Sequence, residues 1–189
     1  MNLTFANKVT IGRILLVPFF IATVMYVSTE RPLLHLLALS LFVIAVISDV
    51  IDGYIARTRG QKTRAGAILD PLADKMLLIS AFICLYIKRD YFTSPDFPLW
   101  FVVAIISRDV ILLLGAMIVR ITTGNLDIEA NKTGKLTAFL HVACVLGVLL
   151  QMPASKLLWP FAIGATIISG VIYIKEGIKK INDTSVHRF

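Results

Sequence analysis

The sequence predicts an all-α integral membrane protein, built as a bundle of six transmembrane helices with a polar cavity at its cytoplasmic end. Hydrophobic residues make up 57% of the 189 positions and the mean hydropathy is +0.82, which is too apolar for a soluble domain of this length. Apolar stretches recur along the chain, each near the roughly 20 residues that span about 30 Å of hydrocarbon. Four aspartates lie in the second and third of these stretches, and they predict the cavity.

Six apolar stretches place the helices in order, and turn-forming residues separate them. The stretches cover residues 9–28, 33–54, 65–87, 99–121, 136–152 and 157–174, of which the fifth is the shortest. Between them lie Arg31-Pro32, Arg59-Gly60, Ser94-Pro95 with Pro98, Gly124-Asn125 and Met152-Pro153. One bundle accounts for the whole length, so we expect a single domain over residues 1–189.

The basic residues predict the orientation of the bundle, because cytoplasmic loops of membrane proteins carry an excess of Lys and Arg. Four of the nineteen lie on one side: Arg31, Lys88, Arg89 and Lys156. Thirteen lie on the other side: Lys8, Arg13, Arg57, Arg59, Lys62, Arg64, Arg120, Lys132, Lys135, Lys175, Lys179, Lys180 and Arg188. We therefore expect both termini in the cytoplasm and a location in a bacterial-type cytoplasmic membrane. The net charge of +7 then faces anionic headgroups and does not imply nucleic-acid binding.

Four aspartates within twenty-six residues are the main functional signal. On a helix, Asp49 and Asp52 share a face at i, i+3, as do Gly66, Asp70 and Asp74 at successive i+4 steps. Two antiparallel helices can therefore bring all four carboxylates to one point. An ionised side chain at membrane depth costs several kcal/mol unless it is paired, so intramembrane aspartates indicate a functional site. A capping or paired role for Asp49 or Asp52 is the structural alternative.

Carboxylate oxygens are hard ligands, and the aspartates are not accompanied by a His/Cys set that would favour zinc. We expect Mg²⁺, or Mn²⁺, and two ions about 4 Å apart, because one Mg²⁺ takes fewer protein carboxylates than four. The polar cavity is thus predicted to contain metal. The basic segment that follows could hold a diphosphate through Arg57 and Lys62, although it could also be only a topology signal. Gly53, Ala56 and Gly66 would allow close approach of a nucleotide, or only of a neighbouring helix.

The string Asp49-x2-Asp52-Gly53-x2-Ala56-Arg57-x8-Gly66-x3-Asp70-x3-Asp74 resembles the signature of the CDP-alcohol phosphotransferase family, with all eight fixed positions present. That resemblance covers essentially the whole chain, since the family has a six-helix membrane core. It implies that Asp49, Asp52 and Asp70 bind the metals, and that Asp74 touches them and acts as general base. It also implies that Gly53, Ala56, Arg57 and Gly66 surround the cytidine diphosphate, and that the protein is a homodimer.

Shorter segments resemble particular members of that family. Asn7-x2-Thr10-x2-Arg13-x4-Pro18 is similar to the amino-terminal segment of phosphatidylglycerophosphate synthases, which adds Asn7 and Thr10 to the CDP site. Ser107-Arg108-Asp109 and Gly134-Lys135-x-Thr137 resemble acceptor-side segments there and in cardiolipin synthases. Relatives commonly have Gln where this chain has His141, for which a hydrogen-bonded core position is favoured over a ligand role.

The resemblance implies transfer of a phosphatidyl group from CDP-diacylglycerol to glycerol 3-phosphate, with Arg108 and Lys135 binding the acceptor phosphate. An unpaired cation inside a span is costly, so Arg108 either faces a polar cavity or pairs with an aspartate. Transfer to phosphatidylglycerol, as in cardiolipin synthases, is the first alternative, and inositol phosphate or serine acceptors follow. From another class, the aspartates could line a divalent-cation transport path, but such a path spreads its charges through the bilayer and often has paired broken helices.

Overall fold

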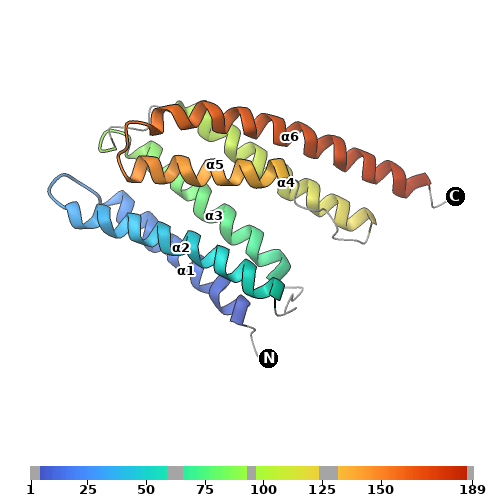
Figure 1. The fold of residues 1–189 in the computed structure, drawn as a ribbon, viewed down its shortest axis with the longest axis horizontal. Helices are drawn as coiled ribbons and strands as arrows, with labels where there is room; N and C mark the ends of the chain where they lie inside the picture. Colours follow the sequence, from blue (N-terminus) through green and yellow to red (C-terminus); the bar gives the residue numbers. More distant parts are fainter. Residues whose placement is uncertain (1–4, 59–65, 93–96, 124–131, 187–189) are drawn as a thin grey trace. The chain divides into compact units, whose positions relative to one another are not determined.

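The computed structural model describes residues 5–58, 66–92, 97–123 and 132–186, and within these ranges the chain forms six α-helices and no strand (Figure 1). The helices are α1 (Phe5–Met25), α2 (Pro32–Thr58), α3 (Gly66–Ile87), α4 (Leu99–Thr123), α5 (Lys132–Leu149) and α6 (Ser155–Val186). Each helix overlaps one predicted apolar stretch, so the all-α prediction is confirmed for the described part of the chain.

Local sequence explains where the helices begin and end. Pro32 opens α2, which suits a residue whose φ is fixed and whose missing N–H would have no helical partner. Pro18 and Pro160 lie inside α1 and α6 without ending them. The largest departure from expectation is α6, which continues beyond residue 174 to Val186, in an extension that includes the good helix formers Lys175, Glu176, Lys179 and Lys180.

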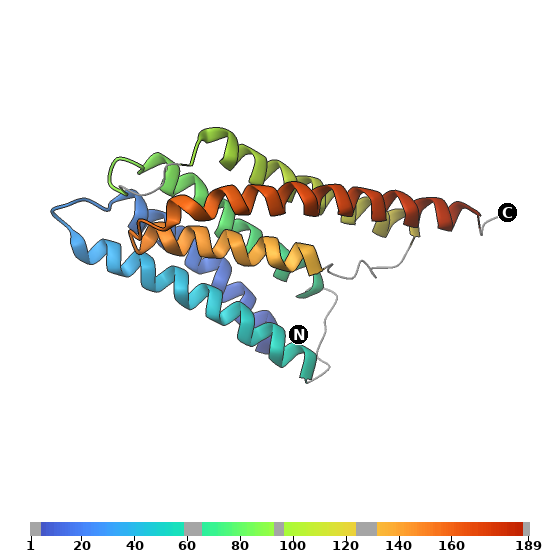
Figure 2. The same cartoon turned by 45° about the horizontal axis from the view of Figure 1, so that its top comes forward.

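Helices α1, α2 and α3 form one compact unit together with residues 145–153, and α1 packs against both α2 and α3. Both ribbon views show α1 and α2 running antiparallel alongside each other (Figures 1 and 2). Phe20 of α1 and Phe42 of α2 are fully buried, with ring centroids 5.7 Å apart. Phe82 and Leu85 bury the facing surface of α3. Helix α1 thus lies between α2 and α3, and its residue Arg13 contacts both of these helices.

His35 of α2 ties the end of α5 to this unit. Its Nε2 bonds the carbonyl oxygen of Leu149, and the Tyr91 hydroxyl lies 3.3 Å from Nδ1. A carbonyl can only accept, so Nε2 carries the proton and Nδ1 accepts from Tyr91. Phe92 packs edge-on against the imidazole at 5.5 Å between centroids. Residues 145–153 therefore belong with the amino-terminal helices, although the rest of α5 does not.

Helices α4 and α6, with α5 up to Cys144, form the second compact unit. At one end of the α4–α6 contact, the Trp159 ring meets Trp100 and Phe101, with centroids 5.9 Å and 5.7 Å away. Further along, the Tyr173 hydroxyl donates to the carbonyl oxygen of Leu112 at 3.1 Å. A Cβ at Gly115 would lie only 3.1 Å from the Tyr173 ring, so the glycine permits this close packing.

Two of the described helices contain segments long and apolar enough to cross a bilayer, residues Pro32–Ile51 and Ser155–Ile178. Large apolar side chains on both segments face outward, among them Leu33 of α2 and Phe161 of α6. Exposed apolar surface of this extent marks a membrane or partner contact in folded proteins. The shorter apolar helices Thr10–Met25 and Thr133–Leu149 also expose large apolar side chains. These features indicate a membrane-associated protein.

Candidate functional site

The candidate site of the first unit is built around Arg13 of α1, whose residue surface is only 2% exposed. Its Nη1 donates to Asp49 Oδ1 of α2 at 2.8 Å and also to Asp74 Oδ1 of α3. One guanidinium nitrogen therefore joins carboxylates that lie 36 and 61 residues away along the chain. The structure thus brings together one aspartate from each of the two predicted helix faces.

Among the described side chains of this cluster, one guanidinium and two carboxylates leave an excess of negative charge. One guanidinium faces two carboxylates, and the side chains of Asp49 and Asp74 remain 42% and 37% exposed. Oxygen atoms that are close together, partly accessible and incompletely neutralised are suited to a hard divalent cation. The two described carboxylates are therefore compatible with a divalent-cation site, with Arg13 as the fixed positive charge that holds them.

The remaining predicted residues of this site are placed only in part. Thr10 is fully buried on α1, one turn before Arg13 and hence on the same face. The other side chains lie outside the part that the structure describes: Asn7 of α1, Asp52, Gly53, Ala56 and Arg57 of α2, Lys62 of the following connection, and Gly66 and Asp70 of α3. Among the described side chains alone, no three His, Cys, Asp or Glu residues gather as a metal site.

Sequence reasoning missed the role of Arg13. The charge pattern places Arg13 with the cytoplasmic cations, whereas the structure buries it and pairs it with two of the four aspartates. A long-range ion pair leaves no periodic pattern in the sequence. The available signal was the position of Arg13 at the third fixed place of the segment Asn7-x2-Thr10-x2-Arg13, inside an otherwise apolar helix.

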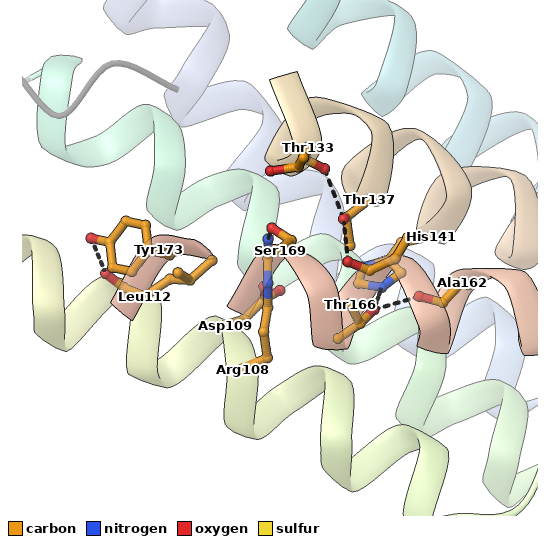
Figure 3. Close-up of polar contacts among 11 residues, drawn as sticks. Arg108, Asp109, Leu112, Thr133, Thr137, His141, Ala162, Thr166, Ser169 and Tyr173 are labelled. Carbon is orange, nitrogen blue, oxygen red and sulfur yellow. Dashed lines mark hydrogen bonds and ion pairs between the residues drawn. The ribbon is translucent and has the colours of Figure 1, made fainter. Parts of the chain in front are cut away.

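A second polar cluster lies in the other unit and is centred on Arg108 of α4 (Figure 3). Nη1 donates to Asp109 Oδ1 at 2.8 Å, and Nη2 donates to Ser169 Oγ of α6 at 2.6 Å. Asp109 is fully buried and Arg108 is 9% exposed, so the ion pair is formed inside the unit. Nε of Arg108 is also buried, with no hydrogen-bond partner among the described residues. Of the two possibilities that the sequence left open, pairing with an aspartate is therefore observed.

Lys135 of α5 lies beside this cluster with its side chain exposed. A Cβ on the preceding residue, Gly134, would lie 3.9 Å from the Ser169 hydroxyl, which places the first turn of α5 at the level of Arg108. The structure thus brings the backbone of the Gly134-Lys135 segment next to the partner of Arg108. Lys135 supplies an accessible positive charge there, whereas the charge of Arg108 is already shared with Asp109.

His141 is a buried hydrogen-bonded residue, as its sequence position suggested. Its Nε2 lies 2.9 Å from Thr166 Oγ1, and that hydroxyl donates to the carbonyl oxygen of Ala162 at 2.6 Å (Figure 3). Since the hydroxyl proton is used on Ala162, Nε2–H of His141 is the donor to Thr166. Thr137 makes a parallel link one turn earlier, with Oγ1 at 3.1 Å from the carbonyl oxygen of Ala165. Helix α5 is thereby attached to α6 through its polar side chains.

Comparisons with known proteins agree with these observations. The profile of the CDP-alcohol phosphatidyltransferase family matches residues 3–172. A Bacillus subtilis (strain 168) protein named CDP-diacylglycerol--glycerol-3-phosphate 3-phosphatidyltransferase is 34% identical over 187 residues, which cover 90% of this chain and 93% of the relative. A Mycobacterium tuberculosis (strain H37Rv) protein named probable phosphatidylglycerophosphate synthase is 34% identical over 93% of this chain and 82% of its own length. A Rickettsia bellii protein with the same name as the Bacillus one is 32% identical, over 89% and 92% of the two chains.

Proposed function

The chain belongs to the CDP-alcohol phosphatidyltransferase family, and we propose that it transfers the phosphatidyl group of CDP-diacylglycerol to glycerol 3-phosphate, giving phosphatidylglycerophosphate and CMP. The relatives that carry this activity in their names align over most of the chain. The observation that carries the proposal is the Asp49–Arg13–Asp74 cluster, because it joins the two ends of the family's aspartate pattern at one nitrogen.

The proposed chemistry is a direct displacement at the phosphorus that bears the lipid. The acceptor hydroxyl oxygen forms the new bond to phosphorus as its proton passes to the carboxylate of Asp74. The bond between that phosphorus and the bridging oxygen breaks, and CMP leaves with the electron pair. Arg13 holds the Asp74 carboxylate in place while leaving it partly accessible to the acceptor. No covalent enzyme intermediate is required.

Members of the family use divalent cations, and we propose two Mg²⁺ (or Mn²⁺) ions held by Asp49, Asp52, Asp70 and Asp74. When bound, the ions supply charge neutralisation of the diphosphate and of the departing CMP. Asp49 and Asp74 support this assignment through their excess negative charge and partial exposure. Arg13 would then keep the two carboxylates together when the ions are absent.

We further propose that the cytidine diphosphate lies against small and polar residues of the first three helices and the connection between α2 and α3. These residues are Asn7, Thr10, Gly53, Ala56, Arg57, Lys62 and Gly66. Thr10 supports the proposal because it is buried on the same face of α1 as Arg13. Arg57 and Lys62 would supply positive charge to the diphosphate, as cations do at phosphate sites generally.

For the acceptor phosphate we propose Lys135 and Arg108. Lys135 is exposed and free to swing toward a dianion, and it lies near Ser169, which Arg108 contacts. A phosphate oxygen could replace the Ser169 hydroxyl at Nη2 of Arg108, since a charged acceptor forms the stronger hydrogen bond. Asp109 would stay bonded to Nη1 and keep the guanidinium oriented.

The remaining features of the proposal concern the membrane. Six spans, cytoplasmic termini, a homodimer and a bacterial-type cytoplasmic membrane would suit a donor whose acyl chains stay in lipid while its head group reaches soluble glycerol 3-phosphate. Lysine accessibility to a membrane-impermeant reagent in inside-out and right-side-out vesicles tests the orientation. Reaction of Lys135 in inside-out vesicles only is the expected result, and reaction in right-side-out vesicles only contradicts it.

The activity itself is tested by offering purified protein CDP-diacylglycerol with one acceptor at a time: glycerol 3-phosphate, phosphatidylglycerol or inositol phosphate. Mass spectrometry of the extracted lipids identifies the product. Phosphatidylglycerophosphate formed only with glycerol 3-phosphate supports the proposal. Cardiolipin formed from phosphatidylglycerol, without turnover of glycerol 3-phosphate, would replace it by the cardiolipin synthase alternative.

A further inference from the structure

An open pocket of about 520 Å³ lies in the first unit, where α1 and α3 both end. Its lining includes Met25, Ser28 and Thr29 from the α1 side, and Ile87, Lys88 and Asp90 from the α3 side. The helix α1 separates this pocket from the Asp49–Arg13–Asp74 cluster. From residue 13 to residue 25 the helix advances twelve residues, or about 18 Å at 1.5 Å per residue. The pocket is therefore a second site of the unit.

The pocket lies where apolar sequence gives way to polar sequence on both helices. The apolar helix Thr10–Met25 ends at the pocket, and two hydroxyl residues of the lining follow it. On the other side, Ile87 is the last residue of α3 and is 55% exposed, and the charged residues Lys88 and Asp90 come after it. A phospholipid has the same division, because its head group lies outside the hydrocarbon core that holds its chains. The lining therefore suits an amphiphile.

The described lining carries one cation, Lys88, and one anion, Asp90. No ion pair joins these two side chains in the described part of the chain. Arg89, which lies between them in sequence, is engaged with Tyr86. Its Nη1 donates to the Tyr86 hydroxyl at 3.0 Å, and the guanidinium lies 5.1 Å from the ring centroid. Two opposite charges that do not neutralise each other are complementary to a ligand that carries both signs.

A turn after α3 fixes the wall that carries these charges. The backbone N–H of Tyr91 donates to the carbonyl oxygen of Lys88 at 2.9 Å, and Asp90 lies inside this turn. The Tyr91 hydroxyl donates to Nδ1 of His35 at 3.3 Å, so its proton is already used and its ring forms part of the wall. The polar groups that remain for a ligand are the Lys88 ammonium, the Asp90 carboxylate and the two hydroxyls of the α1 side.

We propose that this pocket binds the head group of a zwitterionic phospholipid, phosphatidylethanolamine. Lys88 and the two hydroxyls donate to the phosphate, and Asp90 accepts from the primary ammonium. The lipid chains leave the pocket past Met25 and Ile87. An anionic head group such as that of phosphatidylglycerol brings no cation to Asp90, and the ammonium of phosphatidylcholine has no N–H to donate to it. The assignment does not depend on the proposed phosphatidyl transfer.

Binding is measured by native mass spectrometry on the full chain, delipidated in detergent. The protein is titrated with palmitoyl-oleoyl phosphatidylethanolamine, phosphatidylglycerol or phosphatidylcholine. Lys88→Met and Asp90→Asn each remove one charge of the pocket. Lys156→Met and Glu30→Gln are the matched controls, because both residues are exposed and lie outside the lining.

We expect the wild-type protein to bind phosphatidylethanolamine about tenfold or more tighter than phosphatidylglycerol, and also tighter than phosphatidylcholine. Each pocket variant should lose about tenfold in affinity for phosphatidylethanolamine, the value of a charge-assisted hydrogen bond, and both controls should match the wild type. Asp90→Asn should also bind phosphatidylglycerol more tightly than the wild type does, because the repelling carboxylate is gone. Equal wild-type affinities for the three lipids, or unchanged phosphatidylethanolamine affinity in both pocket variants, would overturn the proposal.

Two competitors test the source of the ligand and the place where it binds. Glycerophosphoethanolamine has the same head group without chains, and CDP-diacylglycerol is the proposed donor. We expect neither to displace phosphatidylethanolamine at equal concentration. Displacement by glycerophosphoethanolamine would show a soluble ligand, and displacement by CDP-diacylglycerol would place the lipid in the donor site; either result overturns the proposal. Neither measurement needs turnover, so failure of this inference is distinguishable from failure of the proposed function.

Discussion

Asp49 of α2 and Asp74 of α3 accept hydrogen bonds from the same nitrogen, Nη1 of Arg13. Two carboxylates held at one point repel each other, and a single buried guanidinium neutralises only half of their charge. Arg13 therefore holds the two carboxylates together, and their remaining negative charge stays available for a cation. It explains why the central helix α1 carries a cation where its neighbours carry acids.

Replacing Arg13 should therefore damage catalysis more than folding. Arg13→Lys keeps one charge but places it on a flexible stem, so the donor is no longer fixed at the position of Nη1 between the two carboxylates. We expect the rate of CMP release to fall by about 10²-fold or more, the loss that follows a small misplacement of catalytic groups. The matched control is Arg31→Lys, a change at an exposed residue near the start of α2, which should retain wild-type turnover. Equal activity of the two variants contradicts the role given to Arg13.

The proposed general base can be separated from the metal ligands. Asp74→Asn keeps the shape of the side chain but cannot accept the acceptor proton, and loss of a positioned base costs roughly 10²- to 10⁴-fold in rate. Binding of CDP-diacylglycerol, measured on the same preparation, should remain appreciable. If donor affinity falls as far as turnover does, Asp74 is chiefly a metal ligand and another group takes the proton.

Metal dependence tests the carboxylate cluster as a whole. Chelation of divalent ions should abolish CMP release, and added Mg²⁺ or Mn²⁺ should restore it. Asp70→Asn should abolish CMP release and leave a folded protein that Mg²⁺ no longer activates, because an amide is a weaker ligand for a hard cation. Near-normal turnover of the purified variant at saturating Mg²⁺ would rule out the ligand role of Asp70.

Lys135 gives the cleaner test of the acceptor site, since its side chain is exposed and its removal should not disturb the fold. Lys135→Ala should raise KM for glycerol 3-phosphate by about tenfold or more, the value of a charge-assisted hydrogen bond, with kcat nearly unchanged. KM for CDP-diacylglycerol should not move. Lys156→Ala, an exposed change at the start of α6, serves as the control.

Arg108 requires a paired design. Arg108→Ala alone leaves Asp109 as a buried charge without its ion pair, a change that strongly destabilises proteins. The double variant Arg108→Ala/Asp109→Ala removes both charges, and its KM for glycerol 3-phosphate is the informative quantity. An unchanged acceptor KM in this double variant and in Lys135→Ala would overturn the acceptor-site assignment.

His141 should matter for stability and not for chemistry. His141→Gln keeps a side-chain N–H that can donate to Thr166, so we expect a melting temperature and turnover near the wild type. His141→Leu loses one buried hydrogen bond, which costs about 1 kcal/mol of unfolding free energy. Thermal melting in detergent measures both changes. A catalytic defect in a stably folded His141→Gln protein would contradict this structural role.

Much of the fold could be predicted because its signals are local. Apolar stretches and the breakers between them located all six described helices, the second of which was expected from residue 33 and begins at Pro32. The extension of α6 to Val186 was missed because hydropathy marks only the apolar residues, and a helix can continue beyond them. Hydropathy predicts which residues lie in the membrane, and it does not predict where a helix ends.

The sequence motif predicted the aspartates of the site and did not predict the residue that they share as a partner. The spacing of the aspartates correctly brought one carboxylate from each helix toward the other, since i, i+3 and i, i+4 steps fix a helix face. Their shared partner could not be found in this way, because Arg13 lies 36 and 61 residues from the two acids. By contrast, the pairing of Arg108 with Asp109 joins neighbours in sequence, and it was foreseeable as an alternative for that reason.

Oxygen labelling offers the most direct test of the proposed reaction. Glycerol 3-phosphate carrying ¹⁸O in its primary hydroxyl is incubated with CDP-diacylglycerol and purified protein. The masses of both products are then measured by mass spectrometry. Attack of that hydroxyl on the lipid phosphorus predicts that all of the label appears in phosphatidylglycerophosphate and that CMP is unlabelled. Label in CMP, or its absence from the lipid product, would contradict direct displacement by the acceptor.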